Sequence, residues 1–189
     1  MSKKSKKDSY DDSWMYILLL TTITILAYSL STYTVKIAGV SLTYSIFLLP
    51  VLYLIANYIT KKYCCEKAVL AIVISSISIV IFTLIMNFAM GKSTSISIFT
   101  GSFCALVVSH LVNLLIYRFL NSNTEAPFLL VLLNYMFALV TFYAFYTLIY
   151  LNMIILDNYW LGYFITLVIQ TIMCIGLAYL DKKIKLGRE

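Results

Sequence analysis

The sequence predicts an all-α integral membrane protein in which six transmembrane helices form one bundle. Apolar residues make up 62% of the 189 residues and charged residues only 12%, whereas about a quarter of the residues of soluble domains are charged. The apolar residues fall into six uncharged runs, each close to the roughly 20 residues that a helix needs to cross a bilayer. A chain of this length leaves no room for a second, soluble domain.

The first three runs have recognisable ends or interruptions. The run at 14–33 begins and ends with aromatic residues, which suit the two interfaces of a membrane. The run at 42–60 contains Pro50, which predicts a kink in the second helix. The run at 68–90 has no charged residue and is followed by a Gly-Lys-Ser turn.

The last three runs are separated by polar connections. The run at 96–117 stops before Arg118, and a polar loop ending at Pro127 separates it from the run at 128–151. The run at 159–180 precedes a short basic tail.

The distribution of basic residues predicts the orientation of the chain. Of the 14 Lys and Arg residues, all except Lys36 and Lys92 fall on the side that holds both termini, so the positive-inside rule places the N- and C-termini in the cytoplasm. We therefore expect residues 1–13 to form a disordered cytoplasmic N-terminus. Residues 14–180 would form the membrane domain and residues 181–189 a basic cytoplasmic tail.

Neutral polar side chains gather on single faces of the predicted helices. His110, Asn113 and Tyr117 share one helical face by their spacing, and similar faces occur in the second, fifth and sixth spans. Such groups either hydrogen-bond between helices and hold the bundle together or line a cavity for a polar, planar, uncharged ligand. The candidate substrate-binding residues are Asn57, His110, Asn113, Tyr117, Asn134, Tyr163 and Gln170.

The same residues argue against an enzyme. The predicted spans contain no Asp, Glu, Lys or Arg, and no acid–base pair or nucleophile with a base in register is present. His110 is the only histidine and has no partners at metal-ligand spacing, so we expect neither a metal site nor a cofactor. The basic residues lie beside membrane spans, which favours a topology signal over a nucleic-acid partner.

Two stretches of the chain match motifs of a known family. The residues of the first stretch are Ser31, Lys36, Gly39, Pro50, Asn57, Lys61 and Tyr63. The second stretch, at 105–118, places Ser109, His110, Asn113 and Tyr117 at the positions of a fourth-span motif. In these residues the chain resembles the queuosine-precursor transporters, also called the vitamin-uptake-like transporters, six-span bacterial proteins associated with uptake of 7-cyano-7-deazaguanine and related bases.

The chain departs from the family pattern at its polar positions. Asn57 and Asn113 stand where the family has aspartates, and His110 stands where it has glutamine. Asparagine keeps the size and an acceptor oxygen but replaces the charge with N–H donors. The resemblance therefore implies a divergent transporter in a bacterial cytoplasmic membrane, with an altered specificity or with only a structural role left.

We expect the protein to take up a small planar, neutral nucleobase- or vitamin-like molecule, a queuosine precursor such as 7-cyano-7-deazaguanine first among them. Transport would be facilitative or would use His110 as the titrating group. A substrate-binding subunit of an energy-coupling-factor transporter, with an ATPase module as partner, is a second possibility. A non-transporting membrane scaffold is a third, and any of the three would be compatible with a homo-oligomer.

Overall fold

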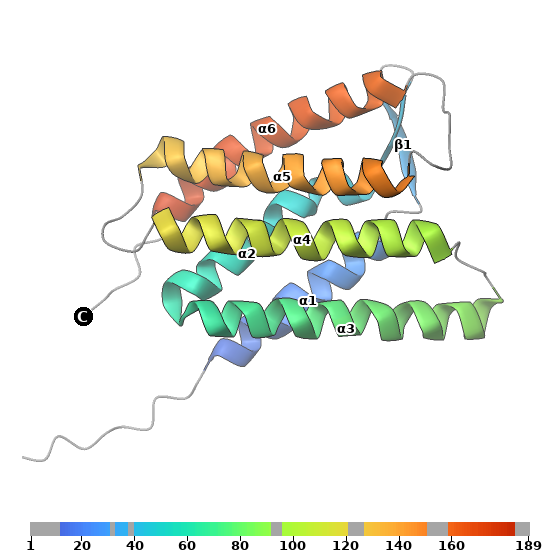
Figure 1. Ribbon diagram of the computed structural model, residues 1–189, viewed down its shortest axis with the longest axis horizontal. Coiled ribbons are helices and arrows are strands. Elements are labelled where there is room, and N and C mark those ends of the chain that lie inside the picture. The colour runs from blue at the N-terminus through green and yellow to red at the C-terminus, as the bar shows by residue number, and fades with distance from the viewer. Residues whose placement is uncertain are drawn as a thin grey trace, which may run out of the picture.

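The computed structural model describes residues 12–30, 33–37, 40–91, 96–120, 127–150 and 159–183. Within these ranges six helices long and apolar enough to span a membrane form one bundle, as the sequence predicts. The helices are α1 Ser13–Leu30, α2 Leu49–Lys62, α3 Cys65–Met90, α4 Ile96–Leu120, α5 Phe128–Tyr150 and α6 Tyr159–Lys183. They run alternately up and down the bundle, so that the described chain begins and ends at the same end (Figure 1).

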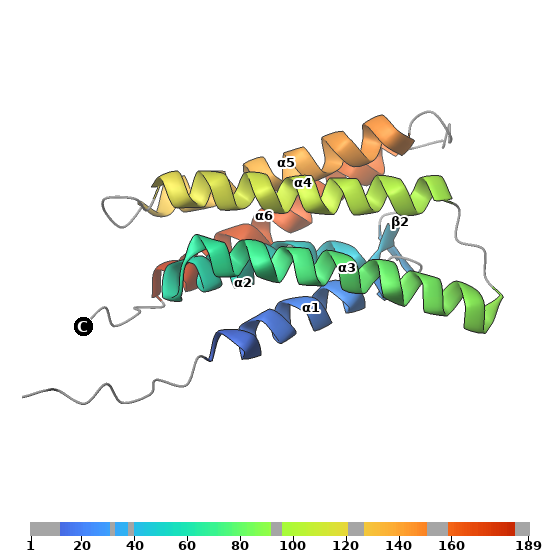
Figure 2. The same cartoon turned by 60° about the horizontal axis from the view of Figure 1, so that its bottom comes forward.

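We call the end that holds Ser13 and Lys183 the termini end and the opposite end the hairpin end. The hairpin end carries two short antiparallel strands, β1 Thr34–Ile37 and β2 Val40–Thr43, which pair with Thr34 opposite Thr43 (Figure 2). The sequence predicts only a short connection here, with Tyr33 still inside the first helix. α1 instead ends at Leu30, because the strands that follow hydrogen-bond to each other and take the chain out of the helix.

The second span is interrupted near the hairpin end. A single 3-10 turn, η1 Tyr44–Phe47, precedes α2, and Leu48 separates the two. Pro50 lies in the first turn of α2, where its missing N–H breaks no helical hydrogen bond. The proline therefore marks the start of a helix, whereas the sequence predicted a kink within one.

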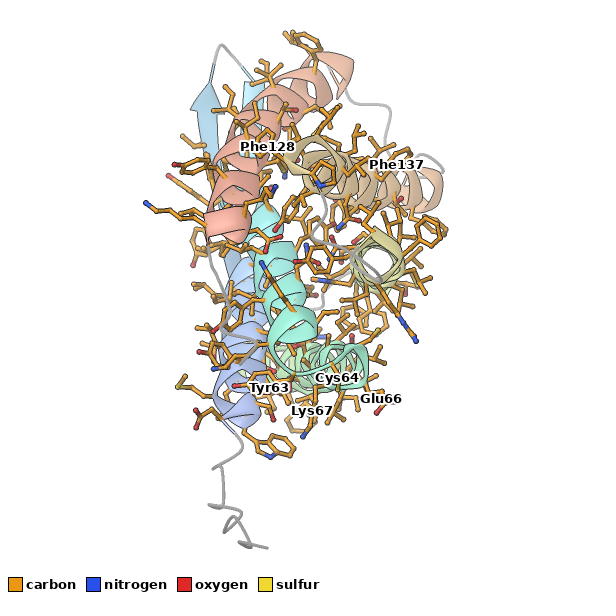
Figure 3. The ribbon with its side chains drawn as sticks, turned by 90° about the vertical axis from the view of Figure 1, so that its left-hand side faces the viewer. Tyr63, Cys64, Glu66, Lys67, Phe128 and Phe137 are labelled. Carbon is orange, nitrogen blue, oxygen red and sulfur yellow. The ribbon has the colours of Figure 1, made fainter. Side chains whose placement is uncertain are left out.

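α2 lies at the centre of the bundle. It contacts each of the other five helices, and an end-on view shows it surrounded by them (Figure 3). Its own side chains Leu52, Tyr53, Ala56 and Ile59 are fully buried and belong to the apolar core of the bundle. Burial on every side explains why α2 presents no broad lipid-facing surface, although it is long enough to cross a bilayer once η1 is included.

The outer surface of the bundle is apolar. Phe88 is 97% exposed and Phe119 is 80% exposed, and Phe137, labelled in Figure 3, is also exposed. Exposed side chains of this size on a soluble protein would cause aggregation, whereas lipid tails solvate them. The inside of the bundle holds the polar residues, an arrangement typical of helical membrane proteins.

Candidate functional site

A chain of three asparagines crosses the middle of the bundle. Asn113 on α4 donates through Nδ2 to Oδ1 of Asn57 on α2 at 2.7 Å, and Asn134 on α5 donates through Nδ2 to Oδ1 of Asn113 at 2.9 Å. All three side chains are fully buried. Three helices that are far apart in sequence are thus joined through neighbouring amides, each hydrogen bond contributing about 0.6 kcal/mol in a membrane.

The asparagine chain has a direction and two unused ends. At one end Nδ2 of Asn57 has no hydrogen-bond partner among the described residues, and at the other end Oδ1 of Asn134 has none. One free donor and one free acceptor therefore remain inside the bundle. Buried polar groups are nearly always hydrogen-bonded, so each end is a position where water or a ligand would be held.

His110 lies one helical turn from Asn113 on α4. Its ring meets the ring of Tyr53 on α2 edge to face, with the two centroids 5.1 Å apart. Nδ1 of His110 is buried and has no partner within the described chain. The Tyr53 hydroxyl donates to the main-chain oxygen of Ala138 on α5 at 3.4 Å. An aromatic pair and an unused imidazole nitrogen therefore lie on the hairpin side of the asparagine chain.

Gln170 connects α6 to the interruption of the second span. Its Nε2 donates to the main-chain oxygen of Ile46 in η1 at 2.9 Å, whereas its Oε1 is buried and has no partner in the part of the chain described. The side chain is fully buried. Gln170 thus satisfies one carbonyl of the broken segment and leaves a second free acceptor inside the bundle.

We expect Gln170→Ala to loosen η1. Loss of the hydrogen bond to Ile46 should lower stability by about 1 kcal/mol and speed amide hydrogen exchange in peptides that cover Tyr44–Phe47. Exchange measured on the detergent-solubilised protein checks this. Ser76→Ala is the matched control, because the Ser76 hydroxyl donates to Ile72 of its own helix. Equal exchange of η1 in both variants would contradict the assigned role.

A second polar cluster lies toward the termini end. The Tyr117 hydroxyl on α4 donates to Oδ1 of Asp181 on α6 at 3.2 Å, and Lys61 on α2 donates to the main-chain oxygen of Asp181 at 3.2 Å. Tyr135 on α5 is fully buried, and its hydroxyl has no hydrogen-bond partner among the described residues. Lys61 and Tyr117 lie one helical turn beyond Asn57 and Asn113, so this cluster borders the donor end of the asparagine chain.

Asp181 corrects the expectation that no carboxylate lies within a span. The sequence places Asp181 in a solvated tail that begins directly after residue 180, but α6 continues to Lys183 and Asp181 is only 2% exposed. The helix continues because nothing in the residues 181–183 breaks it, and its buried face follows Gln170 and Cys174 to Asp181. Residues 182 and 183 are exposed lysines, as expected of a basic end.

The structure brings together most of the residues that the sequence suggested. Asn113 hydrogen-bonds to both Asn57 and Asn134, whereas His110, Tyr117 and Gln170 are buried but contact other partners. Tyr163 lies on α6, and its side chain is outside the described part of the structure. The spacing of polar residues along helical faces therefore identified side chains that lie in the interior, although it could not show which of them contact each other.

Three buried residues around the asparagine chain were missed by the sequence reasoning: Tyr53, Tyr135 and Asp181. Tyr53 precedes Asn57 by four positions and so shares its helical face, a signal that was available. Asp181 lies on the same helical face as Gln170 and Cys174. It was assigned to the tail only because the predicted span ended at residue 180. Tyr135 is adjacent to Asn134, and spacing along one face could not have placed both residues inside the bundle.

The described residues contain no group of three or more His, Cys, Asp or Glu side chains arranged to hold a metal ion. Scans against protein-family models, curated proteins and solved structures found no match to the chain. The fold itself defines the class: this is a multi-pass, all-α membrane protein with an interior lined by amides, tyrosines, one histidine and one carboxyl group.

Proposed function

We propose that the protein imports a small planar, neutral base or vitamin-like molecule, with a queuosine precursor such as 7-cyano-7-deazaguanine the first candidate. The supporting observation is a set of buried polar atoms without partners among the described residues. They are Nδ2 of Asn57, Oδ1 of Asn134, Oε1 of Gln170 and Nδ1 of His110. They come from four different helices and offer both donors and acceptors.

A purely structural role accounts for only part of this arrangement. The two hydrogen bonds within the asparagine chain hold α2, α4 and α5 together, as a scaffold would require. The unused atoms add nothing to the cohesion of the bundle, and each is costly to bury without a partner. A ligand that supplied their partners would remove that cost on binding, which is a reason to favour a binding protein.

A guanine-type base has the chemistry to match these atoms. Its edges carry a carbonyl acceptor together with amino donors, so it can accept from Asn57 and donate to Asn134. The His110 and Tyr53 rings provide aromatic surface beside these groups, and aromatic faces stack on planar bases. A neutral base also suits a site whose asparagines replace charged side chains.

The resemblance to the queuosine-precursor transporters is the reason for naming this substrate class. The residues that carry it in the fourth span, Ser109, His110, Asn113 and Tyr117, are all buried. Asn57, which carries it in the second span, hydrogen-bonds directly to Asn113. By the same resemblance, the protein would function in a bacterial cytoplasmic membrane, with both termini on the cytoplasmic side.

Uptake should depend on His110. We expect His110→Ala to reduce uptake of 7-cyano-7-deazaguanine at least tenfold, because a lost hydrogen bond and ring contact in a buried site cost about 1.4 kcal/mol or more. The assay uses a bacterium that lacks both queuosine-precursor synthesis and its own importer. The base is supplied at low concentration and queuosine is then measured in the tRNA.

Thr22→Ala is the control for expression and insertion, because the exposed Thr22 hydroxyl donates within its own helix. Unchanged queuosine in His110→Ala would remove His110 from the site. No queuosine with the well-expressed parent chain would overturn this substrate, and a ligand panel that gave no thermal stabilisation would then favour a scaffold. Uptake that required a co-purifying ATPase would assign the chain as a substrate-binding subunit.

A further inference from the structure

The buried carboxyl group of Asp181 is not used by the proposed binding site. Its Oδ1 accepts from the Tyr117 hydroxyl, and its Oδ2 is buried with no hydrogen-bond partner among the described residues. Burying an ionised carboxylate costs free energy unless the carboxylate accepts several hydrogen bonds. Asp181 has one such bond to its carboxylate, so one of its two oxygens is left without a partner among the described residues.

The charged and titratable groups around Asp181 come from three helices. Lys61 of α2 donates to its main-chain oxygen, Tyr117 of α4 donates to its carboxylate, and Tyr135 of α5 interacts with it electrostatically. On its own helix Lys182 and Lys183 are exposed. The positive charge of Lys61 favours the ionised form of the Asp181 carboxyl group.

Two features favour the protonated form. The side chain is withdrawn from water, and it lies in the last turn of α6, where the negative end of the helix dipole repels a carboxylate. A proton on Oδ2 would cancel the charge and convert the unused acceptor into a donor. Opposing influences of this kind are what a group needs if it is to bind and release a proton during a cycle.

Asp181 is also connected to the asparagine chain. Tyr117, which donates to Oδ1 of Asp181, lies one helical turn from Asn113 on α4. An ionised Asp181 holds the Tyr117 hydroxyl through a charge-assisted hydrogen bond, whereas a protonated Asp181 holds it more weakly and so loosens the contact of α4 with α6 beside the asparagine chain. The protonation of Asp181 would therefore alter the affinity of the binding site, and a bound ligand would alter proton binding equally.

We propose that Asp181 is the proton-coupling site of the protein, binding one proton at Oδ2 as the ligand is taken up and releasing it afterwards. The inference rests on the proposed function and deepens it, because it supplies the driving ion. Only an O–H bond forms and breaks at the carboxyl group. Between the buried imidazole of His110 and the buried carboxyl group of Asp181, it is Asp181 that hydrogen-bonds to a lysine and a tyrosine, which can stabilise its ionised form.

Infrared difference spectroscopy tests proton binding without any substrate. The detergent-solubilised parent chain is titrated with acid, and we expect a carboxylic-acid C=O stretching band that is missing in Asp181→Asn and retained in Asp12→Asn, which removes an exposed carboxylate. In Tyr117→Phe the band should persist at a shifted frequency, because its hydrogen-bond donor is gone. A spectrum that is the same in the parent and Asp181→Asn, or a band unmoved in Tyr117→Phe, would overturn the assignment.

Proteoliposomes then test the coupling, with radiolabelled 7-cyano-7-deazaguanine as the probe and an inward proton gradient. The parent chain should accumulate the probe several-fold above equilibrium, and Asp181→Asn should only equilibrate it while still exchanging labelled for unlabelled base. Accumulation by Asp181→Asn equal to that of the parent would refute the coupling role. If the parent moves no probe, the proposed substrate fails, while the infrared titration still decides whether Asp181 binds the proton.

Discussion

Replacing Asn113 by alanine is expected to lower the stability of the bundle by about 1–3 kcal/mol and to abolish uptake. Asn113 is the only member of the asparagine chain that both donates and accepts within it. Its loss leaves Oδ1 of Asn57 and Nδ2 of Asn134 without their partners in the interior. Because those two groups belong to α2 and α5, one substitution disconnects three helices.

Thermal unfolding of the detergent-solubilised protein measures the change in stability, and the tRNA queuosine assay measures uptake. Thr22→Ala should stay within about 0.5 kcal/mol of the parent chain, as surface changes usually do. An Asn113→Ala protein as stable as that control would mean that the asparagine chain is not formed. Full stability with lost uptake would instead assign Asn113 to the ligand alone.

The largest loss of stability is expected from Tyr53→Ala, at about 3–5 kcal/mol, which is the usual cost of removing a large buried ring. Tyr53 is fully buried on the central helix, where its ring packs against His110 of α4 and its hydroxyl reaches Ala138 of α5. Alanine would leave a cavity at the point where three helices meet, and packing in the bundle interior would relax into it only in part.

Tyr53→Phe separates the ring from the hydroxyl. It keeps the contact with His110 and removes only a long hydrogen bond of 3.4 Å, so a loss below about 1 kcal/mol is expected. Thermal unfolding in one detergent compares both variants with the parent. Equal losses in Tyr53→Phe and Tyr53→Ala would show that the hydroxyl, and not the packing of the ring, stabilises this part of the bundle.

The fold was readable from the sequence because the physical signal for a membrane helix is long and continuous. The predicted runs at 68–90 and 128–151 differ from α3 Cys65–Met90 and α5 Phe128–Tyr150 by no more than a few residues. The hairpin Thr34–Thr43 was missed, because two four-residue strands give little periodicity. β2 also contacts α6, which lies far away in the sequence, and no local pattern reveals such a contact.

The site could be predicted only as far as helical faces allow. His110, Asn113 and Tyr117 were assigned to one face, and all three are buried. Which atoms pair is a property of the packed helices: Asn113 bonds to Asn57 and Asn134, whereas Tyr117 bonds to Asp181. Asp181 was not predicted, because a charged residue after an apolar run normally lies in water. Only the packed structure shows that it is buried against Tyr117.

The central position of α2 has a consequence for how the protein is made. Together with η1 it has the lowest mean hydropathy of the six spans, and it carries Asn57, whose partner Asn113 lies two spans later in the chain. When α2 leaves the ribosome, nothing that could cover it completely has been synthesised. We therefore expect α2 to be held stably in the membrane only after later spans have been made. Chains that end before α4 should be degraded by membrane proteases, because Asn57 would lack its partner Asn113.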